Sequence, residues 1–413
     1  MTILPIITVA ISLILMILSI VFDWKITIKK LSFGLYWIFC LIGAIICLSF
    51  GFAGDSPIKD IFFNDANINP LKILVIFLSC TSISVLLDKI GFFSYIAAVV
   101  LKKSKGSQTK LFFAFSAVIA ILTIFTSNDI LILTFTPFIC YFTKRAKINP
   151  IPFIISEFVC ANVWSMFFFI DNPTNIYMCA TFGITFIEYA IKMVLPTILS
   201  GFLSCLLVYL IFRKKLHEPI SIDDTEIVKP NKAQLIIGVT GLGIMVLMMA
   251  LSNYIGLELW YIPLVCSVAT FICVTIYNLV SHHSMDVIGK SLLSLPYALI
   301  PFLLSMSVFI TTLSKANFIP QFANFLENQN LFVTGGFSFI LGNLLNNIPM
   351  TMMFTETLAT YNASLPTVYA VIAASNICAL LTSFCFNIFI NIMPAKEPIG
   401  VNKAQMLLAA ITA

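Results

Sequence analysis

The sequence contains few charged residues for its length. Asp, Glu, Lys and Arg make up only 10% of its 413 residues, whereas soluble domains carry about 25%. Hydrophobic residues account for 60% of the chain, and the mean hydropathy is +1.04. These values exclude an ordinary soluble domain and indicate an integral membrane protein.

Several functional signatures are also missing. The eleven cysteines include no CxxC pair and lie in apolar runs, so we interpret them as small buried hydrophobes. The three histidines fall in polar loops, where metal binding is not expected. The sequence has no GxxxxGK[ST], HExxH or GxSxG motif, so neither ATP hydrolysis nor another enzyme activity is expected. We predict no metal, no other cofactor and no nucleic-acid partner.

Long apolar runs dominate what is present. A helix of about 20 residues crosses roughly 30 Å of hydrocarbon, and runs of this kind occupy residues 3–21, 35–52, 191–212, 233–251 and 261–280. The first run lacks a basic segment before it, so we interpret it as a retained helix and not as a signal peptide. The sequence therefore predicts an all-α polytopic membrane protein.

Basic residues predict the orientation of the chain. They cluster in four short connections, which contain Lys25, Lys29 and Lys30; Lys102, Lys103, Lys105 and Lys110; Lys144, Arg145 and Lys147; and Arg213, Lys214 and Lys215. The intervening loops at 53–69 and 252–259 carry little positive charge. Since basic loops stay in the cytoplasm, this side is cytoplasmic and the N-terminus is outside.

Residues 111–142 form a segment with two basic ends, so both ends are cytoplasmic. Each arm has roughly fifteen residues, or about 22 Å of helix, which is short for a full crossing. We favour a re-entrant hairpin that turns at Ser127-Asn128-Asp129, although a tight pair of complete crossings gives the same charge pattern. A second hairpin at 331–358 opens from the opposite side.

The polar breaks occur at matching places in two halves. The first hairpin contains Asn128 and the second Asn346-Asn347, 218 residues further on for Asn346. Asn162 and Asn376 follow these breaks with a spacing of 214 residues. We predict two inverted-topology repeats, each with a re-entrant hairpin and an interrupted transmembrane helix. The predicted boundaries are 1–212 for the first half, 213–232 for a cytoplasmic linker and 233–413 for the second half.

The breaks also predict the binding site. New helix N-termini favour an oxyanion or a polar hydroxyl, and amide oxygens favour Na⁺ or water. We expect Asn128 and Asn347 to cap the helices that follow them. For any one of these residues, simple capping or helix–helix hydrogen bonding is an equally good interpretation. The predicted binding residues are Ser127, Asn128, Asp129, Asn162, Asn172, Thr174, Asn175, Asn346, Asn347, Asn376 and Thr382.

Ionisable residues inside membrane segments are costly and usually functional. Asp129 at the first hairpin tip and Asp171 at the following break are the candidates for coupling to H⁺ or Na⁺. Helix N-terminal stabilisation is the alternative for Asp129, and local capping is the alternative for Asp171. We expect Glu157 to lie near the cytoplasmic interface.

Three motifs carry a family resemblance. They are Ser127-Asn128-Asp129-Ile130-Leu131-Ile132-Leu133 followed by Thr136-Pro137, then Asn172-Pro173-Thr174-Asn175, and finally Leu344-Leu345-Asn346-Asn347-Ile348-Pro349. Together they resemble the ArsB/NhaD branch of the ion transporter superfamily, which is related to the divalent-anion:sodium symporters. The resemblance covers residues 30 to 385 approximately. It implies secondary transport by an elevator-like movement of the part that contains the hairpins.

The resemblance also implies a range of substrates and partners. We expect efflux of a small anion or oxyacid of the arsenite or antimonite type across the cytoplasmic membrane. The alternatives are a Na⁺/H⁺ antiporter, a carboxylate:cation symporter and, less favoured, a passive channel. The expected partners are a small inorganic or organic anion, the lipid bilayer, a second copy of the chain and a separate ATPase subunit. One departure is that Pro398-Ile399-Gly400 comes late, so a counterpart of the 191–212 helix is not expected.

Overall fold

The computed structural model describes residues 3–22, 24–28, 31–63, 69–104, 106–126, 128–217 and 229–392. In these ranges the chain is helical, which confirms the predicted class, apart from one short antiparallel hairpin. Its strands are β1 (Lys25–Ile28) and β2 (Leu31–Gly34). All five predicted apolar runs are helical.

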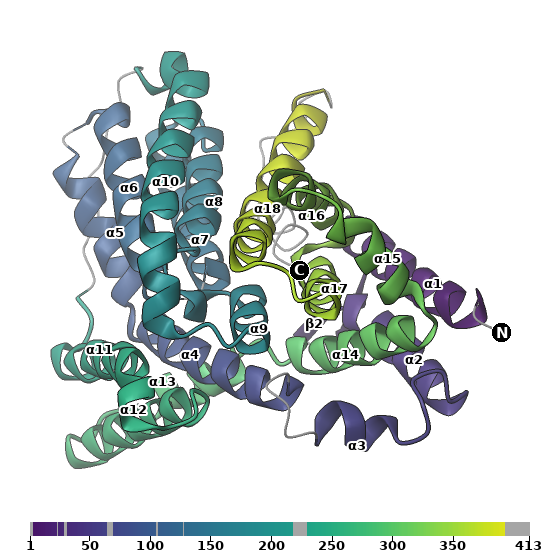
Figure 1. Cartoon of the computed structure of the whole chain (residues 1–413). Coiled ribbons are helices and arrows are strands. Elements are labelled where there is room, and N and C mark those ends of the chain that lie inside the picture. Colours follow the sequence, from purple (N-terminus) through teal and green to yellow (C-terminus); the bar gives the residue numbers. More distant parts are fainter. Residues whose placement is uncertain are drawn as a thin grey trace.

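The first half contains three helices ahead of a core helix, and then a hairpin and a broken helix. In order they are α1 (Ile3–Val21), α2 (Tyr36–Ser49), α3 (Pro57–Phe62), α4 (Pro70–Ile90), α5 (Phe92–Lys103), α6 (Gln108–Thr123), α7 (Asn128–Ala146), α8 (Ile151–Trp164), the 3₁₀ turn η1 (Phe169–Asp171), α9 (Pro173–Thr181) and α10 (Phe186–Leu216). Figure 1 shows α6, α7, α8 and α10 side by side.

The second half repeats this order. Its helices are α11 (Lys232–Ile255), α12 (Tyr261–Val280), α13 (Asp286–Leu293), α14 (Leu299–Lys315), α15 (Phe318–Glu327), α16 (Leu331–Leu345), α17 (Asn347–Thr360) and α18 (Leu365–Ile392). Thus α11–α13 correspond to α1–α3, α14 to α4, α15 to α5, and the α16–α17 hairpin to the α6–α7 hairpin. The predicted domain boundaries remain a prediction, since much of the linker lies outside the described residues.

The turns after the two core helices, α4 and α14, each contain a residue in the left-handed conformation. Gly91 ends α4 with a φ of +90°, and Asn317 separates α14 from α15 with a φ of +63°. Only glycine, and to a lesser degree asparagine, adopts this left-handed conformation at low cost. A short helix then leaves the core helix at a sharp angle; between α14 and α15 the bend is 78°.

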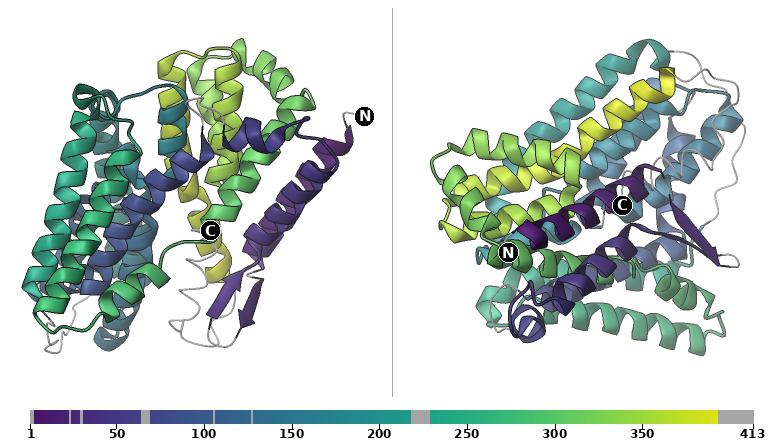
Figure 2. Two further views of the ribbon diagram at one scale, coloured as in Figure 1. Left: turned by 90° about the horizontal axis from the view of Figure 1, so that it is seen from below. Right: turned by 90° about the vertical axis from the view of Figure 1, so that its right-hand side faces the viewer.

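Each half places its first helices on the core helix of the other half. The helices α1, α2 and α3 pack on α14, whereas α11, α12 and α13 pack on α4. Figures 1 and 2 accordingly show α1 and the α11–α12 pair on opposite flanks of the molecule. Lys72 of α4 also pairs with Glu258 in the α11–α12 loop. This hydrogen bond from the ammonium lowers the pKa of the Glu258 carboxyl.

The two core helices point in opposite directions. Leu86 and Ile90, near the end of α4, pack with Val287 and Ile288 of α13, which leads into α14. Conversely, Lys315 at the end of α14 lies beside Gly54, just ahead of α3 and α4. Each core helix therefore ends where the other begins, as predicted for inverted repeats.

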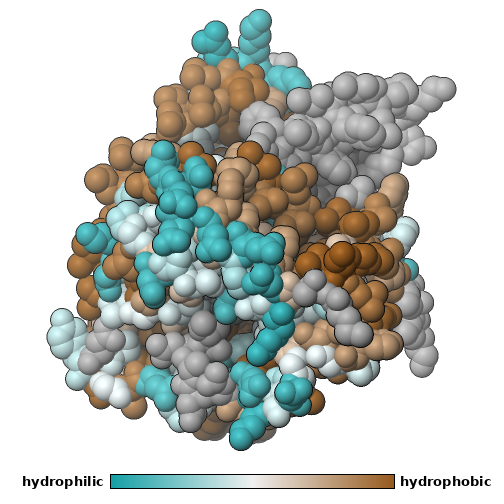
Figure 3. All heavy atoms as spheres, turned by 45° about the vertical axis from the view of Figure 1, so that its right-hand side comes forward, coloured by the Kyte–Doolittle hydropathy of each residue, from teal (hydrophilic) through white to brown (hydrophobic). Residues whose placement is uncertain are grey.

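The outer faces of the helices are apolar. Leu195, Leu199 and Phe202 of α10 are each more than 60% exposed, and Figure 3 shows extensive hydrophobic surface crossed by a band of hydrophilic residues. Five helices of the described residues are long and apolar enough to cross a membrane, or six if the bent α14–α15 pair is one span. The hairpin arm α6 has 16 residues, about 24 Å at 1.5 Å per residue. Re-entry and complete crossing therefore remain alternatives.

One predicted feature is wrong. We expected the second half to contain an interrupted helix between Asn376 and Thr382, but α18 continues as a single helix from Leu365 to Ile392. The reason lies in the sequence, because residues 375–392 contain neither Pro nor Gly. In the first half α8 ends at Trp164 and α9 begins at Pro173, since proline lacks a backbone N–H and pushes Asn172 out of the helical conformation.

Candidate functional site

The tip of the first hairpin lies against α8. The α7 helix begins at Asn128, and its Nδ2 donates to Oδ1 of Asn162 at 3.5 Å, the long limit of a hydrogen bond. Nδ2 of Asn162 in turn donates to the Phe158 carbonyl at 2.9 Å. Both asparagines are buried. The hairpin tip and the end of α8 therefore meet through amide groups.

The chain breaks between α8 and α9 in the manner that Asn-Pro predicts. Asn172 has extended backbone angles, and its Oδ1 accepts hydrogen bonds from Thr174 N at 3.1 Å and from Thr174 Oγ1 at 2.9 Å. Pro173 occupies the first position of α9, where a missing N–H costs nothing. Asn172 is thus a helix cap, and the N-terminus of α9 points its positive dipole end at this break.

A residue from the second half forms hydrogen bonds with the residues at this break. Oδ1 of Asn376 on α18 accepts hydrogen bonds from Asn172 Nδ2 and from Ser165 Oγ, each at 3.0 Å. Its Nδ2 donates to Asn175 Oδ1 at 2.7 Å. Nδ2 of Asn175 then returns to the Ser165 carbonyl at 3.1 Å. We call Ser165, Asn172, Asn175 and Asn376 the asparagine network, and all four side chains are buried.

The tip of the second hairpin lies two residues further along α18. Asn347 is the first residue of α17, and its Oδ1 accepts from the thiol of Cys378 at 3.0 Å. The prediction that Asn347 is a cap is therefore wrong, because Asn346 occupies the cap position, and Asn128 is likewise the first residue of α7 and not the residue before it. Asn346 has a φ of +81°, an uncommon conformation for a residue other than glycine. Such outliers concentrate at ligand sites.

The structure brings together most of the predicted site. Asn128 pairs with Asn162, and Asn376 joins Asn172 and Asn175. Ser127 lies outside the described residues. The backbones of Asp129, Asp171 and Thr382 are helical, but their side chains lie outside the described ones. Their predicted roles in binding and coupling remain predictions.

Two residues that contact the site were not predicted. Ser165 and Cys378 have ordinary sequence surroundings, and their roles depend on contacts with the other half or with the second hairpin. Glu157 lies outside the asparagine network, and the sequence did not predict that its side chain has no exposed surface; its place near the cytoplasmic interface stays a prediction. The available signal was its place in an apolar helix, six residues after the start of α8.

The asparagine network carries no formal charge. Amides donate and accept hydrogen bonds, so the site suits a small solute that does both. The N-terminus of α9 adds a preference for an oxygen with partial or full negative charge. No group of three His, Cys, Asp or Glu side chains in the described part of the chain is arranged to hold a metal ion.

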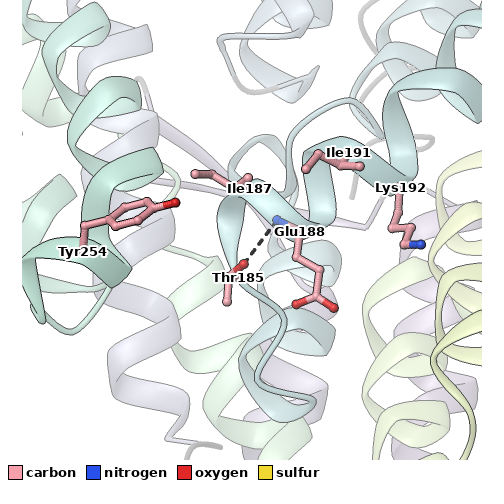
Figure 4. A pocket seen from close by; sticks show the side chains of 6 residues that line it. All are labelled: Thr185, Ile187, Glu188, Ile191, Lys192 and Tyr254. Carbon is pink, nitrogen blue, oxygen red and sulfur yellow. Dashed lines mark hydrogen bonds between the residues drawn. The ribbon is translucent and has the colours of Figure 1, made fainter.

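A surface pocket lies elsewhere, at the start of α10 (Figure 4). Its lining residues are Thr185, Ile187, Glu188, Ile191, Lys192 and Tyr254. The Glu188 N–H already donates to Thr185 Oγ1 at 3.2 Å, so the helix end has its cap. No predicted site residue lines this pocket, and we assign it no role in transport.

The chain has relatives among known proteins. A family model described as citrate transporter matches residues 1–381. An arsenical pump membrane protein of Escherichia coli is 26% identical over 325 residues, which cover 76% of this chain and 73% of the relative. An arsenical pump membrane protein of Shigella flexneri is 25% identical over 325 residues with the same coverage.

A solved structure has a similar fold. The crystal structure of the Alcanivorax borkumensis YdaH transporter aligns with a TM-score of 0.51. The alignment covers 100% of this chain and 96% of the other at 14% sequence identity. At this identity the likeness concerns the fold alone.

Proposed function

Because the chain belongs to the citrate transporter family, we propose that it is a secondary active transporter that moves a small anion or oxyacid across the cytoplasmic membrane. The family and the relatives indicate a permease and not an enzyme. The first candidate substrate is a trivalent oxyacid of the arsenite or antimonite type, in the direction of efflux. The relatives named as arsenical pumps support this choice.

The asparagine network carries the proposal. Asn376 of the second half bonds to Asn172 and Asn175 of the first half, at the repeat interface where transporters of this kind bind their solutes. An uncharged oxyacid has hydroxyl groups that both donate and accept. It can therefore replace these amide bonds one for one. Such exchange is inexpensive, because a hydrogen bond contributes only about 0.5–1.5 kcal/mol net.

A carboxylate:cation symporter is the second candidate, and the name of the family model favours it. A citrate-like solute carries several negative charges. In the described part of the chain, the residues that bond to the asparagine network include no Lys or Arg, and only the N-terminus of α9 offers positive potential. This arrangement supports a neutral or singly charged solute over a multiply charged one. A Na⁺/H⁺ antiporter is the third candidate.

Coupling to H⁺ or Na⁺ is part of the proposal. Asp129 and Asp171 are the carboxylates nearest in sequence to the hairpin tip and to the α8–α9 break. Asp129→Asn keeps the size and capping ability of the side chain but removes its charge. We expect this variant to retain solute exchange and to lose accumulation driven by an ion gradient. Unchanged accumulation across a pH series would leave Asp129 as a helix-terminal residue only.

Counterflow in proteoliposomes tests the function. Vesicles loaded with unlabelled arsenite, antimonite or citrate are diluted into the corresponding labelled solute, and a Na⁺ gradient is imposed in a parallel series. A carrier accelerates uptake when its own substrate is inside, and we expect this for arsenite or antimonite. Uptake without such acceleration would indicate a passive channel, and acceleration by citrate alone would favour the carboxylate symporter.

Partners follow from the same proposal. The apolar outer helices fit the lipid bilayer, and a second copy of the chain and a separate ATPase subunit are further proposed partners. If an ATPase is required, the purified chain alone will exchange solute but will not accumulate it with an imposed ion gradient.

A further inference from the structure

A carboxyl group is buried in the first half, away from the asparagine network. Glu157 on α8 has 0% exposure. Its Oε2 accepts a hydrogen bond from Thr136 Oγ1 on α7 at 2.9 Å, and its Oε1 has no hydrogen-bond partner among the described residues. A buried carboxylate with one unsatisfied oxygen is costly. A group of this kind persists where its charge has a use.

Its position lies between the cytoplasmic loop and the solute site. Glu157 follows the start of α8 by six residues and precedes Asn162 by five. At 1.5 Å per residue these separations are about 9 Å and about 7.5 Å along the helix axis. Lys144 in the last turn of α7 and Lys147 in the loop before α8 lie on the side predicted to be cytoplasmic. Along α8, the Glu157 carboxyl therefore lies between the predicted cytoplasmic side and the hairpin tip.

The second half shows that the fold does not need an acid here. Asn376 occupies in α18 the place that Asn162 occupies in α8. Five residues before Asn376 the chain has Val371, which is also fully buried. Valine meets the same packing requirement without a charge. Glu157 is thus a departure from the repeat, which points to a role beyond packing.

Among the described side chains around Glu157, none supplies a fixed positive charge. The helices packed on α8 are α6, α7, α10 and α18. Among their described side chains, Cys140 of α7 is the titratable group with an electrostatic interaction with Glu157. Cys160 and Cys205 form a separate thiol pair between α8 and α10. The hydroxyls of Ser116 and Ser156, between α6 and α8, bond to each other at 2.6 Å.

The described cationic side chains of these helices are exposed, and they include Lys144 of α7 and Lys192 of α10. Lys110 of α6 and the last-turn residues Arg213, Lys214 and Lys215 of α10 are exposed. None of them pairs with Glu157 in the described structure. The charge of this carboxyl is therefore left for a mobile cation to neutralise.

Thr136, the hydrogen-bond partner of Glu157, lies where a proline interrupts the backbone hydrogen bonds of α7. Thr136 precedes Pro137 inside α7. Because proline has no N–H, the carbonyl four residues earlier loses its helical hydrogen bond, and the helix is easier to bend at this point. Protonation of Glu157 therefore alters its hydrogen bond to Thr136, beside the turn of α7 that Pro137 weakens.

We propose that Glu157 is a proton-binding site that couples the hairpin to the proton gradient. The carboxylate takes up H⁺ at Oε1 to form the neutral acid and releases the same H⁺ on return, so no other reactant is needed. A proton fits better than Na⁺, which would need several more oxygen ligands than the one hydroxyl supplied by Thr136. The coupling part of this inference rests on the proposed transport function, whereas proton binding does not.

Infrared spectroscopy tests proton binding without any substrate. Acid-minus-base difference spectra of the purified protein contain the C=O stretching band of each carboxyl that becomes protonated. We expect a band from a dry carboxylic acid in the wild type that is lost in Glu157→Gln and kept in Glu188→Gln, a carboxyl at the start of α10. Retention of the band in Glu157→Gln would overturn the inference. Glu157→Val, which copies Val371, repeats the test with a side chain that the fold accepts in the other half.

Transport measurements then test coupling. Glu157→Gln is expected to keep arsenite counterflow but to lose the accumulation that a pH gradient drives, and Thr136→Val is expected to weaken that accumulation. Wild-type accumulation in Glu157→Gln, or accumulation that follows Na⁺ and not pH, would contradict the coupling role. If the band is lost in Glu157→Gln but the wild type exchanges none of arsenite, antimonite and citrate, the proton site stands and the proposed function fails.

Discussion

At the scale of single residues, the asparagines near helix ends have two different roles. Asn172 is a true cap, Asn128 lies against Asn162, and Asn347 accepts from a thiol of α18. A cap contributes to stability wherever it lies, whereas the other two side chains connect a hairpin tip to the helix beside it. Substitution should therefore separate the two roles.

Asn128→Ala and Asn347→Ala are expected to impair transport more than folding, because neither residue occupies the cap position before its helix. Asn330→Ala is the matched control. Asn330 caps α16 through Val333 N at 3.0 Å, and its loss should cost about 0.5–2 kcal/mol of stability. Thermal unfolding in detergent and counterflow rates measure both effects. Normal rates in both hairpin variants would remove the tips from the site.

The sequence predicted the asparagine positions because polar breaks in apolar runs are conspicuous. It did not predict Ser165, Cys378 or the burial of Glu157, since these depend on which helices meet in space. Nothing in the residues around Ser165 indicates that Asn376, from the other half, will accept its hydroxyl.

At the scale of elements, the second hairpin packs tightly on α18. A Cβ on Gly342 of α16 would lie 2.6 Å from Sγ of Cys378 and 3.1 Å from Cε of Met350. Glycine is therefore required for this approach. In contrast, a Cβ on Gly336 of the same helix would meet nothing within 4 Å.

Gly342→Ala is expected to destabilise the protein by about 1–3 kcal/mol through overpacking, and to slow transport. Cys378→Ala in the same chain removes the clashing sulfur and should restore much of the stability. Gly336→Ala serves as the control and should be neutral or slightly stabilising. A Gly342→Ala variant as stable as Gly336→Ala would show that the hairpin does not lie this close to α18. Thermal unfolding of these three variants and of the wild type decides between these outcomes.

The hairpins and the first broken helix were predictable because turn chemistry is local. The continuous α18 was not, since the sequence comparison between halves suggested a break where Pro and Gly are absent. Without a proline or glycine nothing ends the helix there, so the analogy with Asn172-Pro173 failed.

At the scale of the whole molecule, the opposed core helices predict opposed faces. The end of α5 and the end of α15 are counterparts, so Lys103 and Asn328 should lie on opposite sides of the membrane, with Lys103 in the cytoplasm. Both side chains are exposed. Lys103→Cys and Asn328→Cys, made separately in a cysteine-depleted background, report this through an impermeant thiol reagent. Labelling of both from one side of the membrane would contradict the inverted arrangement.

The central claim is that the asparagine network between the two halves is the solute site. Asn376 is the residue of the second half that bonds to the first. The most direct measurement is the half-saturation concentration for arsenite counterflow in Asn376→Ala, with the exposed Asn328→Ala as control. Without the amide the solute loses one hydrogen bond to Oδ1 and one to Nδ2 of Asn376, together about 1–3 kcal/mol, so we expect a rise of roughly tenfold to a hundredfold in the half-saturation concentration of folded protein. A half-saturation concentration equal to that of the control would contradict the account.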